Sequence, residues 1–396
     1  MINNKFFFFL LLSLTSFSTV IARSAFCAVP VADVVGKPLG QPHTTLKDVE
    51  AAYHQLPISW VSDPKTCPRI YQLLLHMTVT ILEENNFEAF IEIPHCMIIN
   101  KKNEPETLKG WTLKKNLVEM GSPQSHKKLL PLPIVWQENN INFSNQNVAV
   151  LVTPYEDGDG SLYCAGTRFV IHNRTPDFLY VYAYDYFKQA FKEIMLDQSM
   201  CIFDNFNSNS HEKRENFCEL LTMWAHVPGF CVPLVWGGAS IGKVWKQEDF
   251  YKAEGQIWER PHYGMYPYTG VDASSVILLA AQSLSIPYFC RNSTTASTLL
   301  PELKWNQNLQ NGDLLWLANT LFAINSIERN TIIAVMSYNA GYGCLIELPL
   351  QQLFKDIYTY EQLLYAYHNH VPLTLLNKDG SEAKEIQDFK LLKLPI

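Results

Sequence analysis

The residues best suited to chemistry lie where a polar turn leads into an apolar helix. Residues 270–282 begin Gly-Val-Asp-Ala-Ser-Ser and continue with apolar residues at helical spacing. A helix N-terminus offers free N–H groups and a positive potential, which stabilise an anionic sulfur or oxygen nucleophile. The residue after Asp272 is Ala273, whose methyl group cannot attack a carbonyl carbon, and Ser274 is expected to cap the helix.

Three further segments accompany this turn. Residues 232–240 contain Trp236, Gly237 and Gly238, residues 286–293 contain Ile-Pro and Arg-Asn-Ser, and residues 311–316 read Asn-Gly-Asp-Leu-Leu-Trp. The four segments, in this order, resemble motifs of the NlpC/P60 family of cell-wall cysteine peptidases. That family has Trp-Gly-Gly, Asp-Cys-Ser-Gly, Arg-x-Ser and Gly-Asp-Leu at these places. The resemblance covers about the last two fifths of the chain and implies a papain-like α+β domain.

The resemblance also locates a catalytic triad. It implies a cysteine at the head of the helix, a histidine that opens a later strand, and an orienting polar residue on the next strand. The matching positions are Ala273, Thr331 (or Asn330 with a one-residue slip) and Glu347. All three depart from the pattern, so we expect no intact catalytic residue.

The first hypothesis is therefore an exported, catalytically inactive protein. It would bind the peptidoglycan stem peptide, which in relatives contains D-glutamate and a diamino acid, or another cell-wall partner. The residues expected at its cleft are Trp236, Gly237, Gly238, Asp272 and Ser274.

The second hypothesis is an active peptidoglycan endopeptidase of the γ-D-glutamyl-diamino acid type with a relocated nucleophile. Ser274, Cys231 or Cys290 would attack, and His262 would act as the base. His262 belongs to an aromatic segment between Gly238 and Gly270 that we expect to wall or cap the cleft. A third reading, in which the fold binds a ligand unrelated to the wall, stays open because fold does not fix function.

The rest of the chain predicts an α+β, multidomain organisation. Residues 1–22 have the apolar core and small-residue cleavage site of a signal peptide. A helix is expected from Thr45 to Leu56 and a second from residue 68 to 82. From Phe87 onward, short β-rich runs, including residues 132–136, indicate two small barrels. The predicted layout is a signal peptide (1–22), a linker and helical subdomain (23–86), two SH3-like barrels (87–147 and 148–206) and an NlpC/P60-like domain (207–396).

The second predicted barrel carries two features of functional interest. Its Gly166-Thr167 dipeptide resembles the start of the central strand in bacterial SH3 domains, and the Asp- and Gly-rich residues 157–162 indicate a hairpin turn in preference to a calcium loop. Tyr180 and Tyr182 begin a row of alternate tyrosines that share one face of a strand. This row serves either ligand recognition or half-buried packing.

The charge composition argues against nucleic acid as a partner. The 396 residues carry a formal net charge of −7, without the basic excess typical of nucleic-acid binding. No stretch after the signal is long and apolar enough to cross a bilayer, so we expect export to the periplasm, cell envelope or medium. The nine cysteines are scattered and form no CxxC motif or Cys/His cluster, so neither a metal site nor a cofactor is predicted.

Overall fold

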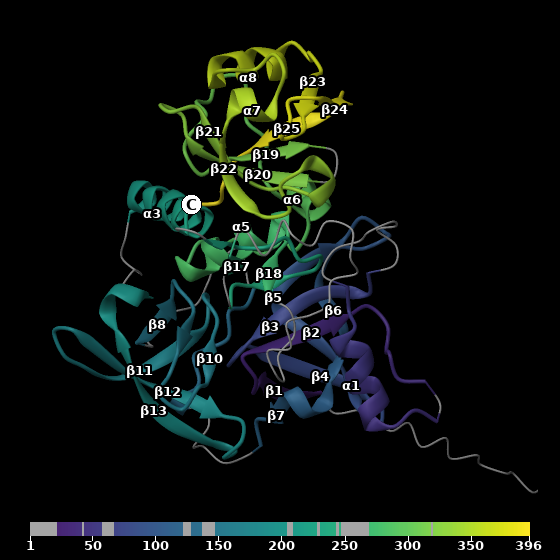
Figure 1. Cartoon of the computed structure of the whole chain (residues 1–396), viewed down its shortest axis with the longest axis vertical. Helices are drawn as coiled ribbons and strands as arrows, with labels where there is room; N and C mark the ends of the chain where they lie inside the picture. Colours follow the sequence, from purple (N-terminus) through teal and green to yellow (C-terminus); the bar gives the residue numbers. More distant parts are fainter. Residues whose placement is uncertain are drawn as a thin grey trace, which may run out of the picture.

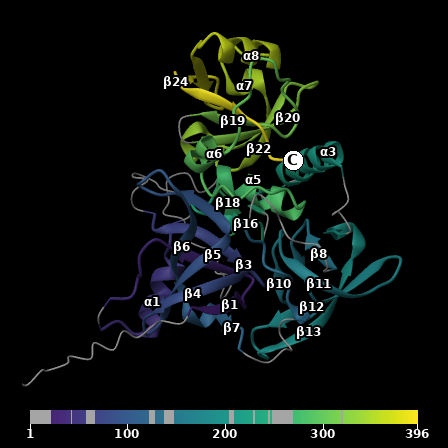
Figure 2. The same ribbon diagram turned by 180° about the vertical axis from the view of Figure 1, so that it is seen from behind.

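The computed structural model describes residues 22–41, 43–57, 67–121, 128–136, 147–203, 209–227, 230–242, 245–246, 269–317 and 320–396. It has a mixed α and β fold in which one seven-stranded and two five-stranded sheets, with a few helices, make up most of the chain. Figures 1 and 2 show the three sheets grouped around helix α5 (Ala273–Ser283). The predicted signal peptide, apart from Ala22, and His262 lie outside the described residues.

The first sheet contains strands that the sequence reading assigned to a linker and a helix. Its order is β3-β2-β6-β5-β4-β1-β7. The helix predicted over residues 68–82 is wrong, because β3 and β4 occupy that stretch. β4 pairs with β5 across the boundary proposed at residue 87. The strands are β1 (Arg23–Cys27), β2 (Val31–Val35), β3 (Arg69–Leu74), β4 (Thr78–Glu84), β5 (Glu88–Ile99), β6 (Pro105–Leu113) and β7 (Leu117–Glu119).

The predicted first helix is confirmed as α1 (Leu46–His54). Thr45 caps it: its side chain accepts from the Asp48 N–H, and Asp48 accepts from the Thr45 N–H in return. Val49 and Tyr53 are buried against the first sheet, whereas Leu46 is exposed.

The second sheet has the order β13-β12-β11-β8-β14. The strand predicted over residues 132–136 is wrong, because Pro131 and Pro133 remove backbone donors that a strand needs. Residues 157–162 form a hairpin turn between two short strands, and Lys192 makes an ion pair with the Asp157 carboxylate at 2.6 Å. The strands of the second sheet are β8 (Val148–Leu151), β11 (Arg168–Arg174), β12 (Phe178–Asp185), β13 (Ala190–Asp197) and β14 (Cys201–Ile202). The hairpin strands β9 (Tyr155–Glu156) and β10 (Leu162–Tyr163) form a separate two-stranded sheet.

The third sheet, ordered β22-β21-β20-β19-β25, is covered on both faces. Leu321 and Ala323 lie in one core with α3 and α5, while Phe322 and Ile324 lie in a second core with α7 and α8. Its strands and the flanking helices are α3 (Ser210–Ala225), α6 (Ser293–Leu299), β19 (Leu314–Leu317), β20 (Thr320–Ser326), β21 (Thr331–Val335), β22 (Leu345–Pro349), α7 (Leu350–Leu353), α8 (Tyr360–His368) and β25 (Phe389–Leu392).

Short paired strands complete the described chain. They are β15 (Phe230–Cys231) with β17 (Trp245–Lys246), β16 (Ala239–Ser240) with β18 (Gly270–Val271), and β23 (Leu373–Leu376) with β24 (Glu382–Ile386). No helix within the described ranges is long and apolar enough to span a bilayer.

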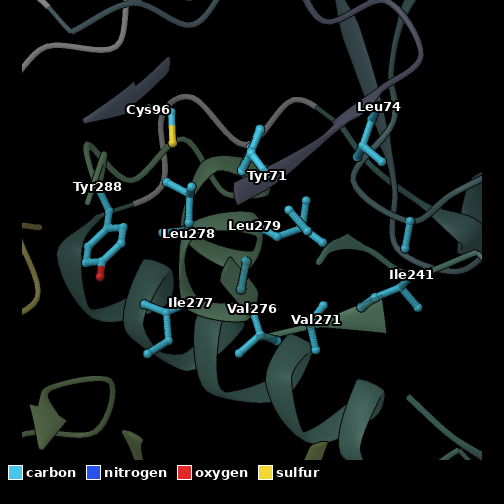
Figure 3. Close-up of a cluster of buried hydrophobic side chains, with 14 of the residues drawn as sticks. Tyr71, Leu74, Cys96, Ile241, Val271, Val276, Ile277, Leu278, Leu279 and Tyr288 are labelled. Atoms are coloured by element: carbon cyan, nitrogen blue, oxygen red, sulfur yellow. The ribbon is translucent and has the colours of Figure 1, made fainter. Parts of the chain in front are cut away.

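Helix α5 is buried on every side, because other elements pack against all of its faces. All of its residues from Ser274 to Ser283 are buried. Figure 3 shows Val276, Ile277, Leu278 and Leu279 in a core that also contains Tyr71 of the first sheet. The first sheet and the α5 region thus share one hydrophobic core.

Candidate functional site

The head of α5 is built by Asp272. Its Oδ1 accepts hydrogen bonds from the N–H groups of Ser274 at 3.1 Å and Ser275 at 2.8 Å. These bonds satisfy two of the free donors that begin every helix. Ala273 occupies the first helical position and is partly buried against the core. The predicted polar turn is present, but its N–H groups are already used by Asp272.

Arg291 closes the same turn from the other side. Its Nη2 lies 2.8 Å from Asp272 Oδ2, and its Nε donates to the Ile70 carbonyl of β3 at 2.8 Å. The guanidinium also lies over the Tyr71 ring, 5.5 Å from the ring centre. Burial alone would lower the pKa of Arg291, but the charge of Asp272 outweighs burial and raises it. This buried ion pair joins the α5 head to the first sheet.

The Trp236-Gly237-Gly238 segment packs against this turn by backbone contact. The Gly238 carbonyl accepts from the Asp272 N–H at 3.1 Å. A Cβ on Gly237, whose φ is +70°, would lie 2.5 Å from the Arg69 carbonyl oxygen. A Cβ on Gly238 would lie 2.5 Å from the Gly270 carbonyl oxygen. Both glycines are therefore required by close approach of the backbone.

Polar side chains of β3 hold the same segment from the first sheet. Gln72 Oε1 accepts from the Ala239 N–H at 3.2 Å and from the Ser240 hydroxyl at 2.6 Å. Arg69 forms a buried ion pair with Asp33 at 2.7 Å. Its Nη1 donates to the Trp236 carbonyl at 3.4 Å.

The structure separates the predicted base and third positions from the α5 head. Residues 233–235 lie between Val271 and Gly343, because Val271 N–H donates to Pro233 and Leu234 N–H donates to Gly343. The α5 head therefore faces the end of β21 and the beginning of β22. Thr331 begins β21 at its other end, roughly 13 Å along the strand from Val335 at 3.3 Å per residue.

Glu347 instead belongs to a second polar cluster, opposite Ile333 in the middle of β21, and Thr331 lies at the end of that strand. Glu347 is 6% exposed and bonds to His226 Nε2 at 2.7 Å, beyond the C-terminal end of α3. Asn325 Nδ2 donates to its other oxygen at 2.8 Å. Burial raises the pKa of Glu347, but the hydrogen bonds with His226 and Asn325 and the charge of Arg329 outweigh burial and lower the pKa.

The proposed replacements for the nucleophile differ in their surroundings. Among the described residues, no hydrogen bond joins a histidine ring to Ser274 or Ser275. Burial raises the pKa of Cys290 to about 12, which keeps its thiol protonated at neutral pH. The pKa of Cys231 is lowered by a hydrogen bond with Cys344.

The two predicted binding tyrosines lie on a different surface. Tyr180 and Tyr182 are half-buried on β12, opposite Met195 and Glu193 of β13. Figures 1 and 2 both place this strand pair away from the head of α5. Tyr184, the next residue in the row, is buried against Phe26. Tyr180, Tyr182 and Tyr186 of the row are each partly exposed, and Tyr180 and Tyr182 are not part of the α5 site.

Sequence reasoning missed the partners that come from distant parts of the chain. Gln72 and Arg69 lay in a run read as a helix, and His226 and Asn325 belong to no motif. Arg291 stood in the Arg-x-Ser segment, directly after the apolar run Tyr288-Phe289-Cys290, and that apolar run was the signal that its charge needs a buried partner.

Comparisons with known proteins support the fold. No protein-family model matches the sequence, and no curated protein matches it. The structure is similar to that of an NlpC/P60 family protein from Bacillus cereus ATCC 10987, with a TM-score of 0.52, 13% identity, and coverage of 83% of this chain and 94% of that one. NlpC2 and NlpC1 from Trichomonas vaginalis also match, each with a TM-score of 0.30. The chain therefore shares the fold of the Bacillus NlpC/P60 structure over most of both chains.

Proposed function

We propose that this chain is an exported NlpC/P60-like protein that binds peptidoglycan stem peptide, or another cell-wall partner, without cleaving it. The observation that carries the proposal is the head of α5. Asp272, Arg291 and the Trp-Gly-Gly segment keep the turn in place, while the residue at the nucleophile's position is Ala273.

Within the described residues, no histidine is hydrogen-bonded at the head of α5, which also supports loss of catalysis. A base must lie within hydrogen-bond reach of the nucleophile. The strand of the third sheet that packs against α5 is β20, and the sequence from Leu314 to Ser326 contains no histidine. His226 is held by Glu347 in the second cluster.

The first and second sheets supply the proposed binding surfaces beside the α5 site. In this proposal both sheets act as SH3-like units, the first contributing β3 to the site and the second offering Tyr180 and Tyr182. The aromatic segment before Gly270 would wall the cleft. Export rests on the apolar residues 6–14 and the small residues near Ala22.

The test measures binding and cleavage together. Purified protein is incubated with insoluble peptidoglycan and with soluble stem peptides. Mass spectrometry follows released fragments, and sedimentation follows protein bound to the wall. We expect co-sedimentation without new fragments. New fragments would overturn the inactive assignment, and neither binding nor cleavage would overturn the ligand class.

Two variants locate the binding surface. Trp236→Ala is expected to reduce co-sedimentation by removing an aromatic side chain beside the α5 turn. Tyr182→Ala tests the second sheet, and its matched control is Tyr365→Ala, because Tyr365 is an exposed aromatic on α8. Equal loss with Tyr182→Ala and Tyr365→Ala would contradict a role for the β12 surface.

A further inference from the structure

Cys231 and Cys344 meet next to the α5 site although they are 113 residues apart in the sequence. The N–H of Leu345 donates to the Val232 carbonyl at 2.9 Å, and Pro233 lies opposite Cys344 in an antiparallel bridge. Side chains alternate along a strand, so Cys231, two residues before Pro233, lies on the same face as Cys344. Both residues are buried, at 5% and 3% exposure.

The two side chains lie diagonally across the strand pair from each other. Interaction between the two thiols lowers the pKa of Cys231 and raises that of Cys344, and burial adds to the rise at Cys344. This asymmetry is what thiol–disulfide exchange requires, since a thiolate attacks and a protonated neighbour follows. Both cysteines are free thiols in the structure.

We propose that Cys231 and Cys344 form a reversible disulfide that ties residues 230–235 to the beginning of β22. The thiolate of Cys231 attacks one sulfur of a small disulfide such as oxidised glutathione and releases one glutathione thiolate. The sulfur of Cys344, having lost its proton to solvent, then attacks Cys231 in the mixed disulfide and releases the second glutathione. Two protein thiols and one small disulfide become one protein disulfide and two small thiols.

The bond would fix one side of the α5 site. Val235 N–H donates to the Val271 carbonyl at 3.1 Å, immediately before Asp272. Residues 232–235 therefore pair with β22 on one side and with the turn before α5 on the other. Tying this segment to β22 limits how far it can move away from the turn when a ligand binds.

A second cysteine pair provides a matched control. Cys290 lies opposite Met97 in a parallel bridge, so the adjacent Cys96 is near it in the backbone. Cys96 and Cys290 belong to the same hydrophobic core, so they form a second buried pair of thiols. Burial raises the pKa of both thiols. This pair should stay reduced under conditions that oxidise Cys231 and Cys344.

The experiment maps the bond without relying on a variant. The chain is refolded from denaturant in glutathione redox buffer, so that burial does not limit access. Remaining thiols are then alkylated in denaturant, and the unreduced digest is analysed by mass spectrometry. We expect a linked pair of peptides containing Cys231 and Cys344, with Cys96 and Cys290 alkylated.

Variants and thermal unfolding sharpen the test. Cys231→Ser and Cys344→Ser should each remove the linked peptide, and Cys290→Ser should leave it unchanged. Oxidation should raise the Tm of the wild type by about 3–8 °C and leave the Cys344→Ser variant unmoved. Alkylation of both Cys231 and Cys344 under fully oxidising conditions, or a linked Cys96–Cys290 peptide in their place, would overturn the proposal.

Discussion

Two polar clusters lie on the same side of the third sheet. One has the helix N-terminus of a nucleophile site, the other has a paired imidazole and carboxylate, and a cysteine peptidase needs both in one place. At the head of α5, Asp272 and Arg291 shape a helix N-terminus at the position of a nucleophile, but the residue there is Ala273. In the second cluster, Glu347 holds His226 as a carboxylate holds a catalytic imidazole, but no thiol is bonded to this pair among the described residues.

The difference between the clusters lies in what each one stabilises. The α5 cluster consists mainly of backbone groups and one buried ion pair, so it fixes the position of a turn. The Glu347 cluster joins α3, β20 and β22 through side chains, so it fixes a helix on a sheet. We infer that both clusters now serve structure, and four substitutions test this inference in order of expected effect.

The largest effect is expected from Arg291→Ala. The change leaves the Asp272 carboxylate at a largely buried position without its cation, and breaking such a pair costs about 3 kcal/mol of unfolding free energy. Chemical denaturation followed by tryptophan fluorescence measures the loss. Arg329→Ala is the control, because Arg329 is 61% exposed beside Glu347. Equal losses in the two variants would contradict the special role of the α5 cluster.

Gly237→Ala should follow. The new Cβ would lie 2.5 Å from the Arg69 carbonyl oxygen at a residue with φ of +70°, so the backbone must shift. We expect a loss of about 2 kcal/mol from strain and overpacking. Gly158→Ala is the matched control, because no atom lies within 4 Å of its added Cβ. A Gly237→Ala protein as stable as the Gly158→Ala protein would show that the segment adapts freely.

Glu347→Gln should have a smaller effect that depends on pH. The folded-state pKa of Glu347 is below its ordinary value of 4.5, so its charge stabilises the fold above pH 4.5. That stabilisation, on the order of 1 kcal/mol for hydrogen bonds to a charged group, disappears as pH falls through the folded-state pKa. The wild type should therefore lose its advantage over Glu347→Gln between pH 4.5 and more acidic pH. An advantage that persists at the acidic end would contradict this account.

Ala273→Cys is expected to have the smallest effect of the four substitutions, because we expect it to produce no cleavage of peptidoglycan. It restores a thiol at the head of α5, but β20 presents no histidine to activate it, so no peptidoglycan fragment should appear. Alkylation of the new thiol by a maleimide, measured by mass spectrometry, confirms that position 273 is accessible. Cleavage by this variant would show that a base exists near the site and would restore the enzymatic hypothesis.

The sequence predicted elements whose signals are local. The helix expected from Thr45 to Leu56 and the polar turn before the apolar helix both form, although Asp272 and not Ser274 caps that helix. Strand β3 was harder to predict from the sequence. Leu73 and Leu74 are both buried, so β3 lacks the alternation of apolar and polar residues that is typical of a half-exposed strand. A continuous apolar run does not distinguish such a strand from a buried helix.

The candidate site was predictable only in part, because some of its residues lie in local motifs and others come from distant parts of the chain. Asp272 and the two glycines lie in short motifs, so their positions follow from the local sequence. Thr331 lies at the start of β21, whereas β20 is the strand of the third sheet that contacts α5, and the local motif did not indicate which strand faces the helix. Strand register and cross-sheet partners such as Gln72 depend on the whole fold, which no local pattern encodes.

The junction between β5 and the α6 region sets the order in which this protein completes its folding. The Ile99 N–H donates to Thr295 Oγ1, 196 residues later in the chain. At translation rates of about 5–20 residues per second, the ribosome needs roughly 10–40 s to add that length. During this time the face of the first sheet that will contact α5 is without its cover. The shared core of the first sheet and α5 can therefore form only after residue 283 has been added, and until then the apolar face of the sheet is exposed to water.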